Sequence, residues 1–395
     1  MGKTLFLVLS GLVVLVMSSG PALGAWKYDP EIKEYLEKVE KERKEEKKKE
    51  REERLADPHR RLRPYQTLEE INEELDRLLA DHPDLFSGGT YGKSVEGRDL
   101  RWIRMNTGDK KDKPELLISA NIHAQEMAAG QMVMYLLRYF AKNYGDDCKA
   151  TRIADSADIY FVPVMNPDNM AKAANTQSKY GITGFVRKNK REVDLNRNFP
   201  YPEEAPDKLK YTAGAPWEWY TTYRGPEPLS EPEARSFVNF VDQHNFLLSL
   251  NYHTSGGMIL YSPGTYPDPF PDTDLMRKMA LAYKDEQFDE YDVHPAIELY
   301  PTIGALDDYL YHRYGILAFT VEVGNNMNQR AWKMHNGTFS PVFWAYNVYD
   351  LEQEAANNIP GALAMIDYAV KVYENPDMRE WEPPEERWVG EPPLK

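Results

Sequence analysis

A histidine and a carboxylate stand three residues apart at the junction of two apolar segments. The run Leu116–Ala120 predicts a buried strand, and apolar residues recur every three or four positions over Met127–Phe140, which predicts a helix. His123 and Glu126 lie between the two. A His-x-x-Glu spacing puts both side chains on one side of a turn, so a single short segment can supply two ligands to a metal ion.

Further polar side chains follow other apolar runs. His253 ends FLLSLNYH, Glu322 lies at the end of ILAFTVEV, and Asp194, Asn196 and Arg197 lie in EVDLNRNFP. In open α/β sheets, sites form at the carboxyl ends of strands. Two histidines and one glutamate are a sufficient ligand set for catalytic zinc and leave a position for water. The His-x-x-Glu pair alone is weak evidence, because a capping histidine beside a solvated glutamate gives the same pattern.

Composition narrows the possible classes of protein. The chain has 395 residues, 42% of them hydrophobic, and a formal net charge of −15. Such an acidic chain lacks the basic footprint of sequence-independent nucleic-acid binding, so no nucleic-acid partner is expected. Cys148 is the single cysteine, which excludes an intrachain disulfide and a cysteine-rich zinc site. Any bound metal must therefore use His, Asp or Glu.

The first 25 residues have the pattern of a signal peptide. Lys3 precedes the apolar run LFLVLSGLVVLVM, and small residues follow, with cleavage possible after Gly24 or Ala25. An uncleaved membrane anchor is the alternative, although the run is shorter than the roughly 20 residues of a membrane span. We expect no stable span after signal removal, and a protein that is secreted or located in the periplasm or cell envelope.

The rest of the chain divides into three parts. Residues 26–63 are nearly all Glu, Lys and Arg, which predicts a charged helical or disordered arm. Residues 64–375 predict one catalytic domain, opened by a helix with Thr67 as N-cap and Glu70 completing a capping box. Residues 376–395 form a Pro-rich acidic tail, which predicts an extended or disordered segment.

Strands and helices alternate through the predicted domain. The strand-like segments are LRWIRM, ELLISA, DIYFVPVM, FLLSLNYH and ILAFTVEV, with helical segments between several of them. This order predicts an α/β fold, with a single mixed, mostly parallel β-sheet sandwiched by helices.

Ten motifs, in order along the chain, carry a resemblance to a known family. They are YQTLEEINEEL, GKSVEGRDL, NIHAQE, NPD, FVRKN, VDLNRNFP, YRGPEPLSEPE, LNYH, LYPTIGALDDYLY and FTVEVG. From about Tyr65 to about Glu374, the chain resembles the M14 zinc carboxypeptidases, the family of the pancreatic carboxypeptidases A and B and of secreted bacterial carboxypeptidases. The resemblance implies the zinc carboxypeptidase α/β/α fold and one Zn²⁺ per chain.

The resemblance also implies a role for each site residue. His123, Glu126 and His253 would bind zinc, and Asp194 would hydrogen-bond His123 from behind. Glu322 would be the general base and acid, and Arg187 would stabilise the oxyanion. Asn196 and Arg197 would bind the terminal carboxylate of a peptide, because a guanidinium fork matches a carboxylate. Tyr300, which stands 22 residues before Glu322, would be the mobile tyrosine that covers the substrate.

Asp307 stands 15 residues before Glu322, where the family places the floor of the pocket for the C-terminal side chain. A carboxylate there would favour Lys or Arg, as in the basic-specific members, unless Asp307 faces solvent or an internal cation. The sequence departs from the pancreatic pattern at Gln125, which replaces an arginine. We expect this change to remove a positive charge from the outer subsites.

The expected activity is hydrolysis of the C-terminal peptide bond of peptides or proteins by a monomer. Two alternatives stay open. One is a cell-wall peptidase that acts on a diaminopimelate-containing stem peptide with the same scaffold. The other is a non-catalytic peptide-binding module, against which the presence of every zinc ligand and of Glu322 argues.

Overall fold

The computed structural model describes residues 5–9, 12–16, 41, 45, 59, 61–108, 110–180, 184–265, 269–324, 342–382 and 388–392. The chain forms two compact units, Met1–Arg60 and Arg61–Lys395. In the first unit, strands β1 (Leu5–Leu9) and β2 (Leu12–Val16) pair antiparallel. The remainder of the predicted signal peptide, and most of the predicted charged arm, lie outside the described residues. No helix among the described residues combines the length and the apolarity that a membrane span requires.

One eight-stranded sheet forms the centre of the second unit, with the strand order β10-β9-β11-β8-β5-β6-β4-β3. Its strands are β3 (Phe86–Lys93), β4 (Asp99–Met105), β5 (Glu115–Ala120), β6 (Asp158–Val162), β8 (Phe246–Thr254), β9 (Met258–Tyr261), β10 (Asp292–Pro295) and β11 (Leu317–Val323). Neighbouring strands run parallel from β6 through β5 and β8 to β11, whereas β3, β4 and β9 introduce antiparallel pairs. The predicted mixed, mostly parallel sheet is confirmed.

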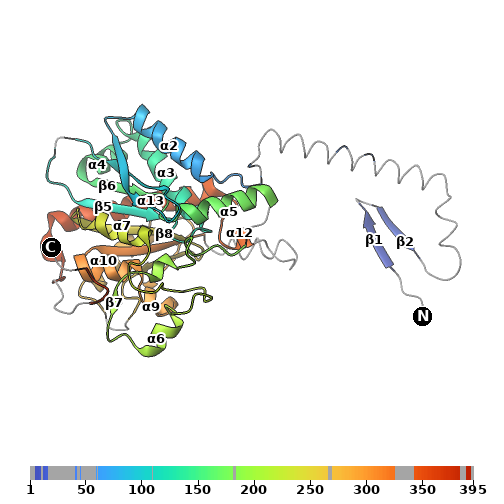
Figure 1. Cartoon of the computed structure of the whole chain (residues 1–395). Helices are drawn as coiled ribbons and strands as arrows, with labels where there is room; N and C mark the ends of the chain where they lie inside the picture. The colour runs from blue at the N-terminus through green and yellow to red at the C-terminus, as the bar shows by residue number, and fades with distance from the viewer. Residues whose placement is uncertain are drawn as a thin grey trace. The chain divides into compact units, whose positions relative to one another are not determined.

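Helices cover the sheet on both faces (Figure 1). They are α2 (Leu68–Asp81), α3 (Met127–Asn143), α4 (Cys148–Ser156), α5 (Pro167–Tyr180), α6 (Asp207–Thr212), α7 (Pro232–Val241), α8 (Thr273–Lys284), α9 (Ala296–Leu299), α10 (Leu306–Tyr314), α12 (Val342–Ala345) and α13 (Leu351–Glu374). Helices α2, α3, α4, α8 and α13 share one hydrophobic core with the sheet, and α7 and α10 share another.

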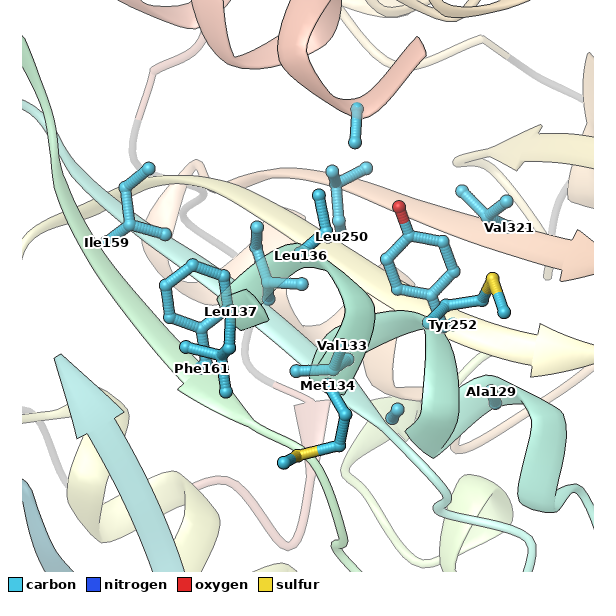
Figure 2. Close-up of a cluster of buried hydrophobic side chains, with 14 of the residues drawn as sticks. Ala129, Val133, Met134, Leu136, Leu137, Ile159, Phe161, Leu250, Tyr252 and Val321 are labelled. Atoms are coloured by element: carbon cyan, nitrogen blue, oxygen red, sulfur yellow. The ribbon is translucent and has the colours of Figure 1, made fainter. Parts of the chain in front are cut away.

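Strand β5 shows why the sheet needs helices on both sides. Leu116 and Ile118 point into the larger core and Leu117 into the smaller one, because successive side chains of a strand face opposite ways. All three are fully buried. Figure 2 shows side chains of α3 among those of β6, β8 and β11; the labelled residues are Ala129, Val133, Met134, Leu136, Leu137, Ile159, Phe161, Leu250, Tyr252 and Val321. Strands that are buried on both faces have continuous apolar sequences, and the run Leu116–Ala120 from which β5 was predicted is an example.

The beginning and the end of the second unit are joined. Helix α2 begins with the predicted capping box, in which the Thr67 hydroxyl accepts from the Glu70 amide and the Glu70 carboxylate accepts from the Thr67 amide. Just before it, the buried Tyr65 donates its hydroxyl to the carbonyl of Val348 and packs edge-on against Phe343. The first element is thereby anchored to the segment that precedes the last long helix.

Part of the predicted tail packs on the domain. Residues Pro376–Met378 form a 3₁₀ turn, and β12 (Trp388–Val389) pairs antiparallel with β7 (Tyr201–Pro202). Trp388 is 8% exposed and belongs to the core that α7 and α10 share. Residues 388–389 are extended, which is one of the two predicted alternatives, whereas Pro376–Met378 form a turn. The proline-rich composition gave no sign that the domain buries the Trp388 ring.

Candidate metal centre and substrate pocket

The candidate metal ligands meet at one edge of the sheet. Strands β5, β8 and β11 are parallel neighbours, so their carboxyl ends lie together. His123 and Glu126 occupy the turn after β5, His253 lies in β8, and Glu322 of β11 is in register with His253. The turn after β5 is shaped by Asn121, whose amide donates to the carbonyls of His123 and Glu126 at 3.2 and 3.0 Å.

The three side chains form a compact group. Glu126 Oε1 lies 2.9 Å from His123 Nδ1, and Glu126 Oε2 lies 3.0 Å from His253 Nδ1. One ligand atom from each residue lies within 4.8 Å of the other two, and the exposed fraction of each residue is at most 3%. Two imidazoles and a carboxylate that converge in this way fit a divalent zinc ion.

The outer nitrogens of both imidazoles also face polar partners. His123 Nε2 lies 3.2 Å from Asp194 Oδ1, and His253 Nε2 lies 3.0 Å from the side-chain amide of Asn251. Such partners orient metal-binding histidines and set the basicity of the ring. Sequence reasoning found Asp194 but missed Asn251, which lies inside a buried strand where nothing in the pattern marks it.

Burial and neighbouring charges oppose each other at these groups. Burial alone would raise the pKa of Glu126, but His123 and His253 outweigh it and lower that pKa well below its usual range. Burial also lowers the pKa of His253, which favours the neutral ring that binds metals. For Asp194, burial is outweighed by Arg187 and His123, and the pKa falls well below its usual range. Both carboxyl groups are thus held as anions.

Arg187 is tied to the metal group through Asp194. Its Nε donates to Asp194 Oδ2 at 2.8 Å, and the side chain is 13% exposed. Backbone contacts fix the same segment, since the Ala124 amide donates to the Arg187 carbonyl at 3.3 Å. The Gln125 side-chain oxygen accepts from the Val186 amide at 2.8 Å. The Arg187 guanidinium therefore belongs to a segment that is attached to the His-x-x-Glu turn.

Gln125 holds the segment that carries Arg187. It is 1% exposed, and its side-chain oxygen accepts from the Val186 amide next to Arg187. Asn347 supports the same turn from the other side, where its amide donates to the Gln125 carbonyl and accepts from the Ala128 amide. Neither role has a sequence signal, because each depends on partners more than 60 residues away.

A cavity opens beside the metal group. Eight of the ten candidate site residues line it, together with Asp308, Thr320 and several others; the eight are His123, Arg187, Asn196, Arg197, His253, Tyr300, Asp307 and Glu322. The other two, Glu126 and Asp194, contact His123. Glu322 is half-buried. Burial, and next the charge of Glu126, raise the pKa of Glu322 to about 8.

Arg197 is a buried cation in the wall of this cavity. Its exposed fraction is 2%, and among the residues that the structure describes no carboxylate lies within ion-pair distance of it. One guanidinium nitrogen donates to the Asn196 carbonyl at 2.5 Å, another lies 3.4 Å from the Tyr300 hydroxyl, and Nε has no partner. A buried cation without an anion is costly, so the site favours an anionic guest.

Asp307 and Asp308 are neighbours with different surroundings. The Asp308 carboxylate accepts from the amides of Gly264 and Thr265 at 2.9 Å each, so its lone pairs are used inside the protein. Asp307 accepts from the Thr320 hydroxyl through Oδ2, whereas its buried Oδ1 has no hydrogen-bond partner among the residues with described positions. Burial, opposed in part by Thr320, raises the pKa of Asp307 to about 7. Asp307 therefore presents an unsatisfied acceptor at the cavity.

Comparison with known proteins agrees with the fold and the site. The zinc carboxypeptidase family matches residues 71–343, and the chain belongs to this family. It is 31% identical to carboxypeptidase A2 of Rattus norvegicus over 255 residues, which are 62% of this chain and 59% of the relative. It is 32% identical to carboxypeptidase A1 of Bos taurus over 219 residues, 55% of this chain and 51% of the relative. The chain thus spans between half and three-fifths of these relatives.

Solved structures share the architecture. Carboxypeptidase A from Helicoverpa armigera superposes with a TM-score of 0.65 at 20% identity, covering 79% of this chain and 75% of its own. Thrombin-activatable fibrinolysis inhibitor superposes with a TM-score of 0.64 at 20% identity, with the same coverage. At this identity the likeness concerns the fold alone.

Proposed function

We propose that this chain is a secreted zinc metallocarboxypeptidase that removes the last residue of peptides or proteins and prefers Lys or Arg there. One observation carries the preference: a single cavity holds a buried guanidinium with no anion, and a buried carboxylate oxygen with no donor, among the residues that the structure describes. A C-terminal Lys or Arg residue supplies both missing partners, its α-carboxylate for Arg197 and its cationic side chain for Asp307.

Asn196 can bind the α-carboxylate of the same C-terminal residue. Its amide oxygen accepts from the Leu306 backbone at 2.9 Å, which leaves the amide N–H groups to donate to a substrate carboxylate. Tyr300 is 47% exposed, and its ring lies 5.8 Å from the Arg197 guanidinium carbon. It can therefore cover a carboxylate bound by that guanidinium. An enzyme that requires a free carboxylate in this position cuts only at the chain end.

The residues around the cavity divide the chemical work. His123, Glu126 and His253 would hold a zinc ion, whose Lewis acidity would lower the pKa of water to near neutrality. Glu322 takes the proton of the attacking water and later gives it to the departing amine. A nearby divalent cation favours the ionised form of Glu322 that the first step needs. Arg187 provides fixed positive charge where the carbonyl oxygen of the scissile bond becomes negative.

A cell-wall stem peptide is the second substrate class to consider. Diaminopimelate also carries an amine that Asp307 could bind, but its side chain ends in a further carboxylate. That carboxylate would enter a pocket lined by Asp307 and Asp308, where like charges repel. The charge arrangement therefore favours Lys and Arg.

The specificity is tested with peptides that differ only in the last residue, ending in Arg, Lys, Phe, Leu or diaminopimelate. We expect the highest kcat/KM for Arg and Lys, and a reversal toward Phe and Leu in the Asp307→Ile variant. Asp285→Asn, which removes an exposed negative charge outside the cavity, serves as the control and should change nothing. Equal turnover of Phe and Arg peptides by the unaltered enzyme would refute the preference.

The remaining parts of the proposal need separate measurements. Mass spectrometry of the exported protein should find a new N-terminus after Gly24 or Ala25, with 26–63 retained as an arm ahead of the catalytic domain (64–375). An uncleaved, membrane-bound product would instead indicate an anchor. Metal analysis should give one zinc per chain, and light scattering should give the mass of a monomer.

A further inference from the structure

The C-terminal residues form a segment that is fixed to the catalytic domain, here named the strap: residues 376–382 and 388–392. Its β12 adds a second strand to β7, with Trp388 opposite Pro202 and Val389 opposite Tyr201. Gly390 has φ +78° and lies so close to Pro228 that a Cβ would stand 2.4 Å from that ring. Such a close approach requires glycine and fixes the path of the strap.

Two strap side chains hold helix α10. The Trp388 ring stacks on His312 with centroids 3.9 Å apart and planes 11° from parallel. Glu391 accepts from Arg313 at 2.7 Å, in an ion pair whose side chains are only 5% and 7% exposed. A pair this buried is strongly disfavoured when one partner is removed, because the remaining charge is left without compensation.

The first part of the strap holds the end of the same helix. The Arg379 guanidinium donates to the buried Asp272 carboxylate at 2.6 Å and to the carbonyl of Gly315 at 2.6 Å. Gly315 terminates α10 in a left-handed conformation, and the Trp381 ring lies against it. The second half of α10 is therefore held at its last turn by both parts of the strap.

The two elements that the strap contacts carry, or closely follow, the proposed substrate-binding groups. Asp307 lies in the first turn of α10, and Arg197 stands four residues before β7. The two segments are interlocked near the cavity, since the Phe199 amide donates to the Gly304 carbonyl at 3.2 Å. The Phe199 ring also stacks with Tyr309 of α10 at 6.1 Å. Movement of either element would change the separation between the guanidinium and the carboxylate.

We propose that the strap is a positioning element of the substrate pocket: Trp388 and Glu391 hold α10 and β7 so that Asp307 and Arg197 engage opposite ends of one C-terminal residue. This inference rests on the proposed function. Trp388 and Glu391 touch neither the metal ligands nor Glu322, so the strap acts on binding and selectivity rather than on the chemical step.

The test uses the full chain with Trp388→Ala, Glu391→Gln and, as a control, Leu75→Ala, which opens a cavity under α2 away from the pocket. kcat and KM are measured for Arg- and Phe-terminated peptides well below each variant's unfolding midpoint, with zinc content determined in parallel. For Trp388→Ala we expect KM of the Arg peptide to rise about tenfold and kcat to change less than about twofold. Glu391→Gln, which keeps the shape of the side chain, should raise this KM about threefold.

The outcomes test the role of the strap separately from the proposed preference for Lys or Arg. A lower Arg-to-Phe ratio of kcat/KM in both strap variants, and an unchanged ratio in a Leu75→Ala enzyme of equal or lower stability, would support the inference. KM values in the strap variants that match the KM of Leu75→Ala would overturn the inference. If Trp388→Ala does not fold, the KM and selectivity of Glu391→Gln alone test the inference. If the unaltered enzyme has no preference for Arg, the proposed specificity fails, and the strap is judged by KM alone through Arg197.

Discussion

The two halves of the cavity are built in different ways. The proposed catalytic half, with His123, Glu126, His253 and Glu322, lies at the ends of parallel strands at the centre of the sheet. The proposed substrate half, with Arg197, Tyr300 and Asp307, lies on a 3₁₀ turn, a loop and a short helix. Strands in a buried sheet hold their ends rigidly, whereas the second group depends on long-range contacts between irregular segments.

Charge balance differs in the same way. In the catalytic half, the Glu126 carboxylate lies beside His123 and His253, and the Asp194 carboxylate behind it lies beside His123 and Arg187. In the substrate half, Arg197 and Asp307 each keep an atom that has no hydrogen-bond partner in the described part of the chain. The charges of the catalytic half are balanced within the protein and its metal, whereas those of the substrate half are balanced only when a substrate is bound. Changes in the catalytic half should therefore affect kcat, and changes in the substrate half should affect KM and selectivity.

The largest expected effect tests the catalytic half. Replacing the carboxylate in Glu322→Gln removes the proton acceptor but keeps the shape, so kcat should fall by about 10²–10⁴-fold. Steady-state kinetics with zinc analysis of the same sample measure this. Zinc content and KM should stay as in the unaltered enzyme. Retention of more than a tenth of the turnover would show that another group moves the proton.

The next effect tests the anion site of the substrate half. Arg197→Met should raise KM for peptides with a free C-terminus by about 10–100-fold, the range for loss of charge-assisted hydrogen bonds. Arg197→Lys keeps the charge without the planar fork and should lose less. Peptides with an amidated C-terminus lack the anion and should be equally poor substrates for all three enzymes. A decrease in kcat with an unchanged KM in these variants would contradict the proposal that Arg197 acts in substrate binding and not in the chemical step.

The third effect concerns pH. Because burial raises the pKa of Asp307 to about 7, this carboxyl is neutral below that pH and ionised above it. The ratio of kcat/KM for Arg over Phe peptides should therefore fall about tenfold from pH 8 to pH 6. Titration of Glu322 or of bound water affects both peptides equally and cancels in the ratio. The Asp307→Asn variant provides the control and should show a flat ratio.

The smallest effect probes how the catalytic half is supported. Gln125→Met keeps the volume but removes the acceptor of the Val186 amide, which should allow Arg187 to move and lower kcat about three- to tenfold. Combination with Arg187→Met distinguishes positioning from general damage. In the Arg187→Met background, the substitution at Gln125 should have no further effect on kcat. Additive losses would mean that Gln125 acts elsewhere.

The sequence marked the residues of the proposed catalytic half far more clearly than the residues that hold them in place. His123, Glu126, His253 and Glu322 are recognisable because they follow apolar runs whose strands must end at one edge of a sheet. The sheet itself was predictable for the same reason. Gln125, Asn251 and Asn347 were not, since each acts through a partner that only the fold brings close. The docking of Trp388 was also missed, because two tryptophans seven residues apart among prolines and acidic residues show no period.

The contact between Tyr65 and Val348 has a consequence for the order of events during synthesis. These residues are 283 positions apart, so the opening segment of the domain stays without its partner until nearly all of the polypeptide has left the ribosome. The pairing of β5 with β8 likewise waits for more than a hundred intervening residues. We therefore expect the domain to fold late and slowly, and not in two successive halves. A chain whose synthesis is arrested before position 343 should remain sensitive to proteases.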